Sequence, residues 1–321
     1  ANGGHDGRPF FLPLLQSLFF AILDLFKGGT AMHKVQAKSI LSARNGINIY
    51  RGCTHGCIYC DSRSACYQMG HAFEDVAVKA NAPELLEDAL RRKRRRCMVG
   101  TGSMCDPYLP LEQTTRLTRR CLEVIDRQGF GAAVLTKSDL LLRDLDVLKR
   151  INQKGKAVVC TTFTTFDEDL CRILEPNVCS TRRRFEMLKA CHEAGIRTGV
   201  WLCPILPLIN DTEENLRGLL NYCFEAGVTA IVNFGMGVTL REGNREYFYA
   251  QLDRHFPGMK DRYVRTFGNR YECPSPAAVR LMQIFQEECQ RHGVLWKPED
   301  AMTWLMEFED AQAGEQLDLF L

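Results

Sequence analysis

Three cysteines lie close together on one short segment of the chain. They are Cys53, Cys57 and Cys60, in the stretch RGCTHGCIYC at residues 51–60. Thiolates are the ligands that iron–sulfur clusters require, and the two glycines in the stretch allow the chain to curl. The spacing C-x3-C-x2-C therefore predicts a loop that holds three irons of a 4Fe-4S cubane. The fourth iron would stay open to a substrate or cofactor, as in a catalytic metal centre.

A zinc site is the alternative interpretation of the same loop. Zinc prefers tetrahedral sulfur and nitrogen ligands, and His55 or Cys66 could supply the fourth one. Zinc sites of this kind usually combine two separated C-x2-C pairs, and the sequence has no second pair. The sequence therefore favours the iron–sulfur cluster.

The remaining cysteines indicate a reducing compartment. The chain has 15 cysteines among 321 residues, about 5%, whereas small disulfide scaffolds have roughly 8–10%. Most of them stand singly in apolar runs, as Cys160 and Cys203 do, where a thiol usually packs as a small buried hydrophobic group. We therefore expect a reduced, cytoplasmic protein.

Short β-rich runs alternate with amphipathic helical patterns through most of the chain. Strands are predicted at residues 47–50, 97–101, 132–136, 157–162, 198–203 and 229–234, and helices at 83–95, 114–127, 139–152, 182–194 and 212–226. Such alternation predicts an α/β protein with a parallel sheet, most simply a partial (β/α)6 barrel of the TIM type. We expect the barrel at 32–240, a mainly helical C-terminal extension packed on it at 241–310, and a flexible tail at 311–321.

The first 31 residues do not match this pattern. Residues 9–26 are apolar but contain Pro13, Gln16, Ser17 and Asp24, and they fit neither a membrane span nor a signal peptide. We expect a non-native leader, with Met32 as the natural start and no stable membrane insertion. An amphipathic surface anchor is the alternative.

The cysteine loop belongs to a series of motifs that follow one another along the chain. They are NIYRGCTHGCIYC at 48–60, GSMCDPYLPLE at 102–112, LTKS at 135–138, LEP at 174–176 and PILPLIND at 204–211. In this order they resemble the radical S-adenosylmethionine (SAM) superfamily, and within it the branch related to spore photoproduct lyase. The resemblance implies a 4Fe-4S cluster and SAM as cofactors. It also implies that SAM is reductively cleaved to methionine and a 5′-deoxyadenosyl radical, which abstracts hydrogen from a substrate.

The resemblance also implies roles for individual residues. Cys53, Cys57 and Cys60 would hold the cluster, and SAM would chelate the open iron through its amino and carboxylate groups. The residues implied to contact SAM are Tyr59 against the adenine, Gly100, Gly102 and Ser103 near the amino group, and Lys137 and Thr162 at the carboxylate. For Lys137 the alternative is a solvated lysine at a helix start, and for Thr162 an ordinary strand residue.

Two positions depart from the lyase. The lyase returns a hydrogen atom to its substrate from a cysteine, and by spacing that position is Ser103 here; the nearest thiol is Cys105. Either Cys105 has taken over this role or it only packs. The lyase also has a tyrosine directly after the third cluster cysteine, where this chain has Asp61. Both departures argue against assuming a thymine-dimer substrate.

Several features bear on partners. The formal net charge is only +2, with 41 basic and 39 acidic residues. The run Arg91–Arg96 could contact phosphates, or it could be a solvated, dipole-favoured helix end. Gln316–Phe320 resembles the peptide that binds the bacterial sliding clamp, although a tail packed on its own barrel is the alternative. The family also implies an electron donor such as flavodoxin or ferredoxin.

We therefore expect a radical SAM enzyme related to spore photoproduct lyase, acting in DNA lesion repair. One alternative keeps the chemistry and changes the substrate to a peptide or a tRNA. The other is a non-catalytic metal-cluster module that binds nucleic acid.

Overall fold

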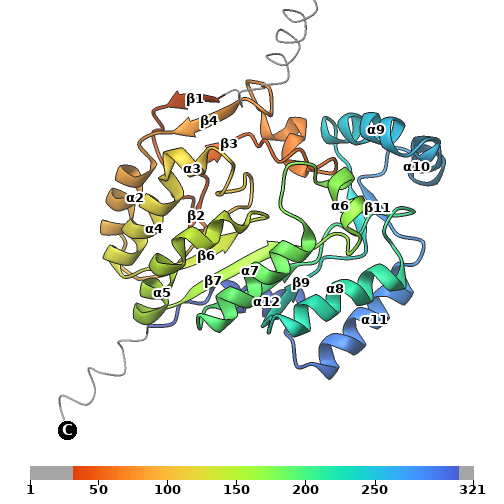
Figure 1. Cartoon of the computed structure of the whole chain (residues 1–321). Coiled ribbons are helices and arrows are strands. Elements are labelled where there is room, and N and C mark those ends of the chain that lie inside the picture. The colour runs from red at the N-terminus through yellow and green to blue at the C-terminus, as the bar shows by residue number, and fades with distance from the viewer. Residues whose placement is uncertain (1–31, 311–321) are drawn as a thin grey trace, which may run out of the picture.

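The central sheet of the computed structural model, which describes residues 32–310, consists of six parallel strands (Figure 1). Their order is β2-β5-β6-β7-β8-β9, so neighbours in space are also consecutive in the α/β part of the chain. The strands are β2 (Gly46–Ile47), β5 (Met98–Thr101), β6 (Gly131–Leu135), β7 (Ala157–Thr162), β8 (Arg197–Trp201) and β9 (Ala230–Val232). The prediction of an α/β partial barrel is confirmed.

Helices cover the outer face of this sheet. They are α2 (Ala82–Arg91), α4 (Leu117–Gln128), α5 (Leu145–Lys154), α7 (Thr181–Glu193) and α8 (Glu213–Glu225). Alternate strand residues such as Val99, Val134 and Val159 point outward and form one core with the apolar faces of these helices. The helix predicted at 114–127 is interrupted at Arg116, whose φ of 49° is left-handed, and so a short helix α3 (Glu112–Thr115) precedes α4.

The other strand residues point into the barrel. Met98, Val158 and Cys160 pack there against α12 (Pro298–Met306), the last described helix, through Leu305. Lys156, which is fully buried next to the start of β7, donates hydrogen bonds to the carbonyl oxygens of the segment that carries α12. The C-terminal extension therefore packs inside the barrel as well as on it.

The sequence did not predict a second, three-stranded sheet. It joins β1 (Met32–Val35), β4 (Val76–Lys79) and β3 (Tyr50–Arg51) in the order β1-β4-β3. The strand predicted at 47–50 is in fact two strands, because the chain leaves the barrel sheet after β2 and enters the small sheet at β3. The cysteine loop begins directly after β3.

Short 3-10 helices span Asp61–Arg63, Ala65–Tyr67 and Asp139–Asp144, and the remaining α-helices and strands lie in the C-terminal part and between β7 and α7. They are α6 (Glu168–Leu174), the antiparallel pair β10 (Gly237–Thr239) and β11 (Glu272–Pro274), and the helices α9 (Asn244–His255), α10 (Met259–Phe267) and α11 (Ala278–Arg291). No helix within residues 32–310 has the length and apolar character needed to cross a membrane. The predicted leader at 1–31 and tail at 311–321 lie outside the described residues.

Gly102 shows how closely the barrel strands approach at their carboxyl ends. Its φ is +97°, and a Cβ atom there would lie 2.0 Å from the carbonyl oxygen of Leu135. We expect Gly102→Ala to destabilise the fold by about 3 kcal/mol or more, because a left-handed backbone and a backbone clash are combined. Urea unfolding measures this. Gly70→Ala is the control, since nothing lies within 4 Å of a Cβ at that position; equal unfolding midpoints for the two variants would contradict the prediction.

Candidate active site

The cysteine loop curls back over the small sheet. Gly52 has a φ of +90°, and a Cβ there would lie 2.5 Å from the carbonyl oxygen of Phe73, which also accepts a hydrogen bond from the Cys53 amide at 2.9 Å. Cys53 and Cys57 are buried, and Cys60 is half-buried. Only a glycine can make this approach, so Gly52 sets the point at which the loop turns.

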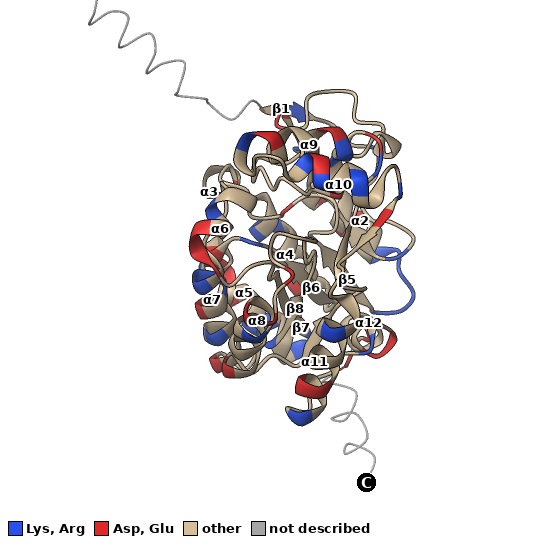
Figure 2. Cartoon of the chain, turned by 90° about the vertical axis from the view of Figure 1, so that its right-hand side faces the viewer, with Lys and Arg blue, Asp and Glu red and all other residues tan. Residues whose placement is uncertain are grey.

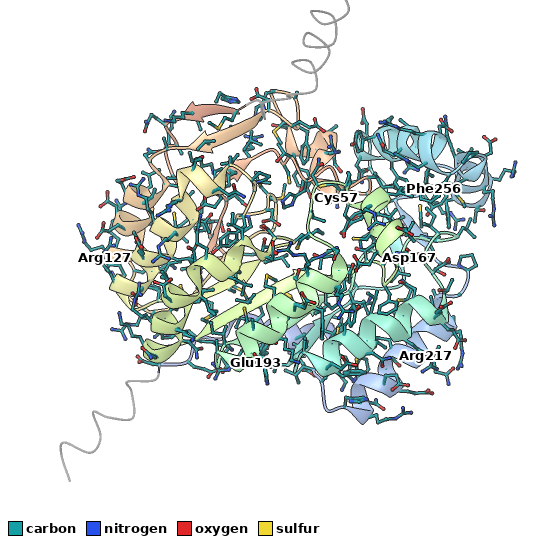
Figure 3. All side chains as sticks on the ribbon, viewed as in Figure 1. Cys57, Arg127, Asp167, Glu193, Arg217 and Phe256 are labelled. Atoms are coloured by element: carbon teal, nitrogen blue, oxygen red, sulfur yellow. The ribbon has the colours of Figure 1, made fainter. Side chains whose placement is uncertain are left out.

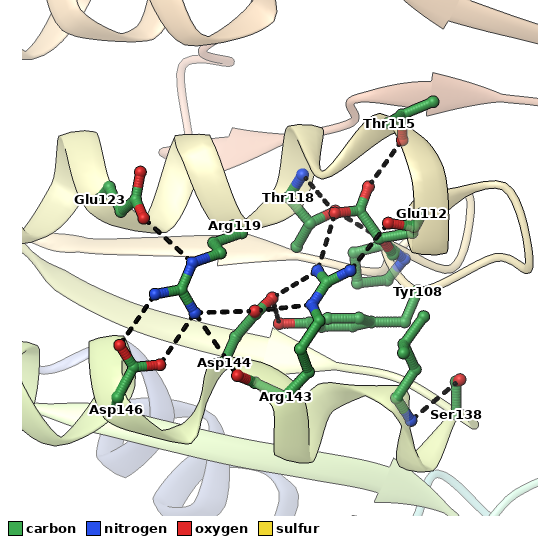
Figure 4. A network of polar contacts seen from close by, with 12 residues as sticks. Tyr108, Glu112, Thr115, Thr118, Arg119, Glu123, Ser138, Arg143, Asp144 and Asp146 are labelled. Atoms are coloured by element: carbon green, nitrogen blue, oxygen red, sulfur yellow. Dashed lines mark hydrogen bonds and ion pairs between the residues drawn. The ribbon is translucent and has the colours of Figure 1, made fainter.

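A network of buried charges fixes the chain in front of the loop (Figure 4). The carboxylates of Glu112 and Asp144 are fully buried, and Arg143 forms ion pairs with both. Glu112 also accepts a hydrogen bond from the hydroxyl of Tyr50, three residues before Cys53. The loop therefore starts from a rigid point.

The LEP motif forms the wall on the other side of the loop. The carbonyl oxygen of Leu174 accepts the amide hydrogen of Ile58 at 3.0 Å, and the amide of Asn177 donates to the carbonyl oxygen of His55 at 3.1 Å. The side-chain amide of Asn177 donates to the carbonyl oxygen of Thr54 at 2.9 Å. The middle of the loop thus has hydrogen-bond partners that belong to another part of the chain.

A cavity of about 1710 Å³ opens beside the loop at the carboxyl ends of the strands. Figure 2 looks toward this open side, where β5 to β8 lie between α9 and α10 above and α11 and α12 below. Parallel α/β barrels place their active sites at this end. Of the predicted site residues, the cavity lining includes Tyr59, Cys60, Gly100, Gly102, Ser103 and Lys137.

Lys137 supplies a charge to the cavity wall. Its Nζ lies 5.9 Å from the centre of the Tyr59 ring and has no hydrogen-bond acceptor or ion pair among the described residues. Burial would lower the pKa of this ammonium, but Cys57 and Glu175 outweigh that effect and raise it overall, so the group stays charged. A cation in the cavity wall with no ion pair among the described residues fits an anionic group such as the SAM carboxylate.

Thr162 is placed differently from the other predicted contacts. It ends β7 on the inner face but does not line the cavity, and its carbonyl oxygen accepts a hydrogen bond from Arg184 at 2.7 Å. Its predicted contact with SAM stays a prediction.

The side chains around the loop fit a cubane better than a single zinc ion. No group of three or more His, Cys, Asp and Glu side chains in residues 32–310 converges on one ion position. The buried His55 instead faces Asp106, with 3.5 Å between Nδ1 and Oδ2, and the exposed Cys66 lies 3.4 Å from an Arg241 nitrogen. A cubane binds its three thiolates at three separate irons, so its ligands need not converge on one point.

Cys105 lies behind the loop and not in the cavity lining. Its thiol is buried and donates a hydrogen bond to the carbonyl oxygen of Gly52 at 2.7 Å. The neighbouring Cys105 side chain also lowers the pKa of Cys53 to about 6, which favours the thiolate that a cluster ligand needs. Hydrogen return by Cys105 stays a prediction, and this packing favours the alternative that it supports the loop.

Replacing Cys105 with alanine tests the two roles. We expect the variant to lose iron to a chelator roughly tenfold faster, because the carbonyl oxygen of Gly52, the residue before Cys53, loses its hydrogen-bond donor. The remaining loaded protein should still cleave SAM. Cys121→Ala is the control, since Cys121 is an equally buried cysteine on α4. Normal iron retention combined with loss of substrate turnover would instead support hydrogen return.

Two residues of the site could not be singled out from the motifs. Arg184 is fully buried although it belongs to the run Arg182–Arg184. Helical periodicity could have indicated this burial, because Met187, Leu188 and Cys191 lie on the same face of α7 as Arg184. Cys203 lines the cavity just beyond β8, and burial raises the pKa of its thiol to about 11. The sequence signal for Cys203 was its position directly before Pro204, the first residue of the motif PILPLIND.

The basic run lies away from the cavity. Arg96 is two residues before β5, and its guanidinium lies next to Gly129 at the end of α4. Arg96 and Gly129 both lie at the amino-terminal end of the strands. Figure 3 shows Arg127, two residues before Gly129, far from Cys57. Phosphates bound by the run Arg91–Arg96 would therefore not lie at the cavity. The clamp-like peptide Gln316–Phe320 lies outside the described residues.

Comparisons with known proteins show the family of this chain. The model of the radical SAM superfamily matches residues 47–246. An uncharacterized protein of Mycobacterium tuberculosis is 32% identical over 240 residues, covering 73% of this chain and 70% of that protein. A radical SAM Nalpha-GlyT isomerase of Pseudomonas phage M6 is 21% identical, covering 80% and 52%. The solved structure of spore photoproduct lyase complexed with dinucleoside spore photoproduct has a TM-score of 0.62 at 13% identity, covering 88% of this chain and 94% of that one. With three cysteines on the predicted loop and a match over most of its length, this chain belongs to the radical SAM superfamily.

Proposed function

We propose that this radical SAM enzyme abstracts hydrogen from a nucleotide of DNA, in a repair reaction like that of spore photoproduct lyase. When bound, the reduced 4Fe-4S cluster supplies the electron that cleaves SAM to methionine and a 5′-deoxyadenosyl radical. The chain's own task is to orient the substrate next to that radical and to exclude water. Cys53, Cys57 and Cys60 would hold the cluster, and Lys137 would bind the SAM carboxylate.

The observation that carries this proposal is the rim of the cavity. The rings of Phe234 and Tyr271 line it and are 64% and 43% exposed, with the Arg241 guanidinium 4.8 Å from the centre of the Tyr271 ring. Arg44 lines the same cavity and has no ion pair or hydrogen bond within residues 32–310. Exposed rings that can stack on bases, and a cation that can bind a phosphate, are elements of single-strand recognition.

The size of the cavity supports the same proposal. Its volume of about 1710 Å³ exceeds the roughly 300–1,000 Å³ of ordinary small-molecule sites. Space therefore remains beside SAM for a base turned out of its stack. The spore photoproduct lyase structure, which shares this fold, is itself a complex with a dinucleoside.

Binding and product analysis with UV-irradiated, thymine-rich single-stranded DNA test the proposal. We expect Arg44→Glu to weaken binding about tenfold or more, because an attraction to phosphate becomes a repulsion. Arg94→Glu, a charge reversal in the exposed basic run, is the control and should bind nearly as the wild type does. Unchanged lesions with reduced, cluster-loaded wild type would overturn the repair reaction and favour a peptide or tRNA substrate. If the loaded protein forms no 5′-deoxyadenosine from SAM, the hypothesis that remains is the non-catalytic module that binds nucleic acid.

A further inference from the structure

A fully buried ion pair lies behind the cysteine loop. The side chains of Glu175 and Arg184 are both 0% exposed and form an ion pair with each other. Burying two charges is costly, and a well-packed apolar pair of similar volume is often as stable or more stable. Fold stability alone therefore does not account for this pair, and the question is which conformation it fixes.

The carboxylate of Glu175 holds the aromatic residue of the loop. It accepts a hydrogen bond from the hydroxyl of Tyr59, the residue directly before Cys60. The hydroxyl of Thr164 lies 3.1 Å from the Tyr59 oxygen and 3.4 Å from the carboxylate. These contacts fix the tyrosine ring at the edge of the cavity, with Lys137 on its face.

Arg184 connects the same carboxylate to the end of a barrel strand. Its Nη1 donates to the carbonyl oxygen of Thr162 at 2.7 Å, and its Nη2 lies 3.2 Å from Cys171 Sγ. The pair therefore joins the cysteine loop to the end of β7.

Backbone hydrogen bonds fix the position of Glu175 itself. The carbonyl oxygen of Leu174, one residue before it, binds the amide of Ile58, and Asn177, two residues after it, binds His55 and Thr54. The chain on both sides of the carboxylate is thus attached to the loop that the carboxylate orients. None of these contacts involves the cluster or SAM.

We propose that Glu175 is a positioning residue that shapes the cysteine loop before the cluster is inserted. Its carboxylate fixes Tyr59, and through it the backbone at Cys60, while Arg184 provides the counter-charge. The inference rests on the proposed function only in naming the cluster and SAM as the groups that the loop binds. A preformed loop is itself a property of the cluster-free chain.

Three variants separate positioning from packing. Glu175→Gln removes the charge, Tyr59→Phe removes only the hydroxyl, and the double variant Glu175→Leu/Arg184→Met replaces the pair with apolar groups. Backbone amide exchange across residues 54–60 is measured in the cluster-free protein, together with iron retention after reconstitution, SAM affinity and the unfolding temperature. Glu186→Gln is the control, because Glu186 is an exposed carboxylate on α7, the helix that carries Arg184.

We expect amide exchange in the loop to become roughly tenfold faster in Glu175→Gln and in the double variant, as for the loss of a hydrogen bond to a charged group. Tyr59→Phe should change in the same direction by less. Iron retention and SAM affinity should fall in the same variants. The double variant should nevertheless unfold near the wild-type temperature.

Two results would overturn the proposal. The first is a double variant with wild-type loop exchange and iron retention, which would mean that the pair only fills space. The second is a wild-type loop that exchanges as fast as an unstructured peptide. If the wild type takes up iron but binds no SAM, the proposed function fails, and the exchange data still decide the role of Glu175.

Discussion

Cys57→Ala is expected to lose the cluster and with it the cleavage of SAM. The two remaining thiolates can bind only two irons, and even changes to groups around metal ligands lower affinity about 10–100-fold. We therefore expect iron content after anaerobic reconstitution, and the yield of 5′-deoxyadenosine, to fall by at least about 100-fold. Iron analysis and chromatography of the SAM products measure the two quantities.

Cys66→Ala is the matched control for this experiment. Cys66 lies six residues after the last proposed ligand, is exposed, and contacts Arg241 instead of the other loop thiols. Its replacement should leave iron content and SAM cleavage unchanged. Loss of iron in Cys66→Ala with retention in Cys57→Ala would exclude the assigned ligand set.

Lys137→Met should weaken SAM binding without unfolding the protein. Hydrogen bonds to charged groups contribute roughly 1.5–3 kcal/mol, so the dissociation constant should rise about 10- to 100-fold. The unfolding temperature should fall only slightly, because the ammonium has no hydrogen-bond acceptor among the described residues and only the nearby charges favour it. Calorimetric titration of the reconstituted protein with SAM and thermal unfolding of the same sample measure both effects.

Lys149→Met controls for the general loss of a positive charge. Lys149 is an exposed lysine on α5, outside the residues that line the cavity. It should bind SAM as the wild type does. Equal SAM affinity in Lys137→Met and wild type would favour the alternative of a solvated lysine at a helix start.

The parts of the site that could be predicted from the sequence are those carried by local spacing. Three cysteines within eight residues must share one loop, and Lys137 follows a strand whose pattern is clear. These features need no knowledge of distant packing. The six-stranded partial barrel followed from a similarly local alternation of strand and helix patterns.

The parts that could not be predicted depend on contacts between distant segments. Arg184 stands in a run of three arginines, and although helical periodicity places it on the apolar face of α7, its charged partner Glu175 becomes visible only in the packed structure. Strand β3 has two residues, too few for any period to be visible. Cys105 is close to Ser103 in sequence, yet the turn after β5 directs it behind the loop and away from the cavity.

The packing of α12 inside the barrel has a consequence for the order of events during synthesis. Residues 298–309 are made after all six barrel strands, yet Lys156 finds its acceptors only at Trp304 and Glu307 and its ion pair at Glu309. A nascent chain that has completed β5 to β9 therefore still exposes the inner side chains that α12 later covers. Apolar surface exposed in this way makes partly folded chains prone to aggregation. We expect the nascent barrel to depend on a chaperone until α12 has left the ribosome.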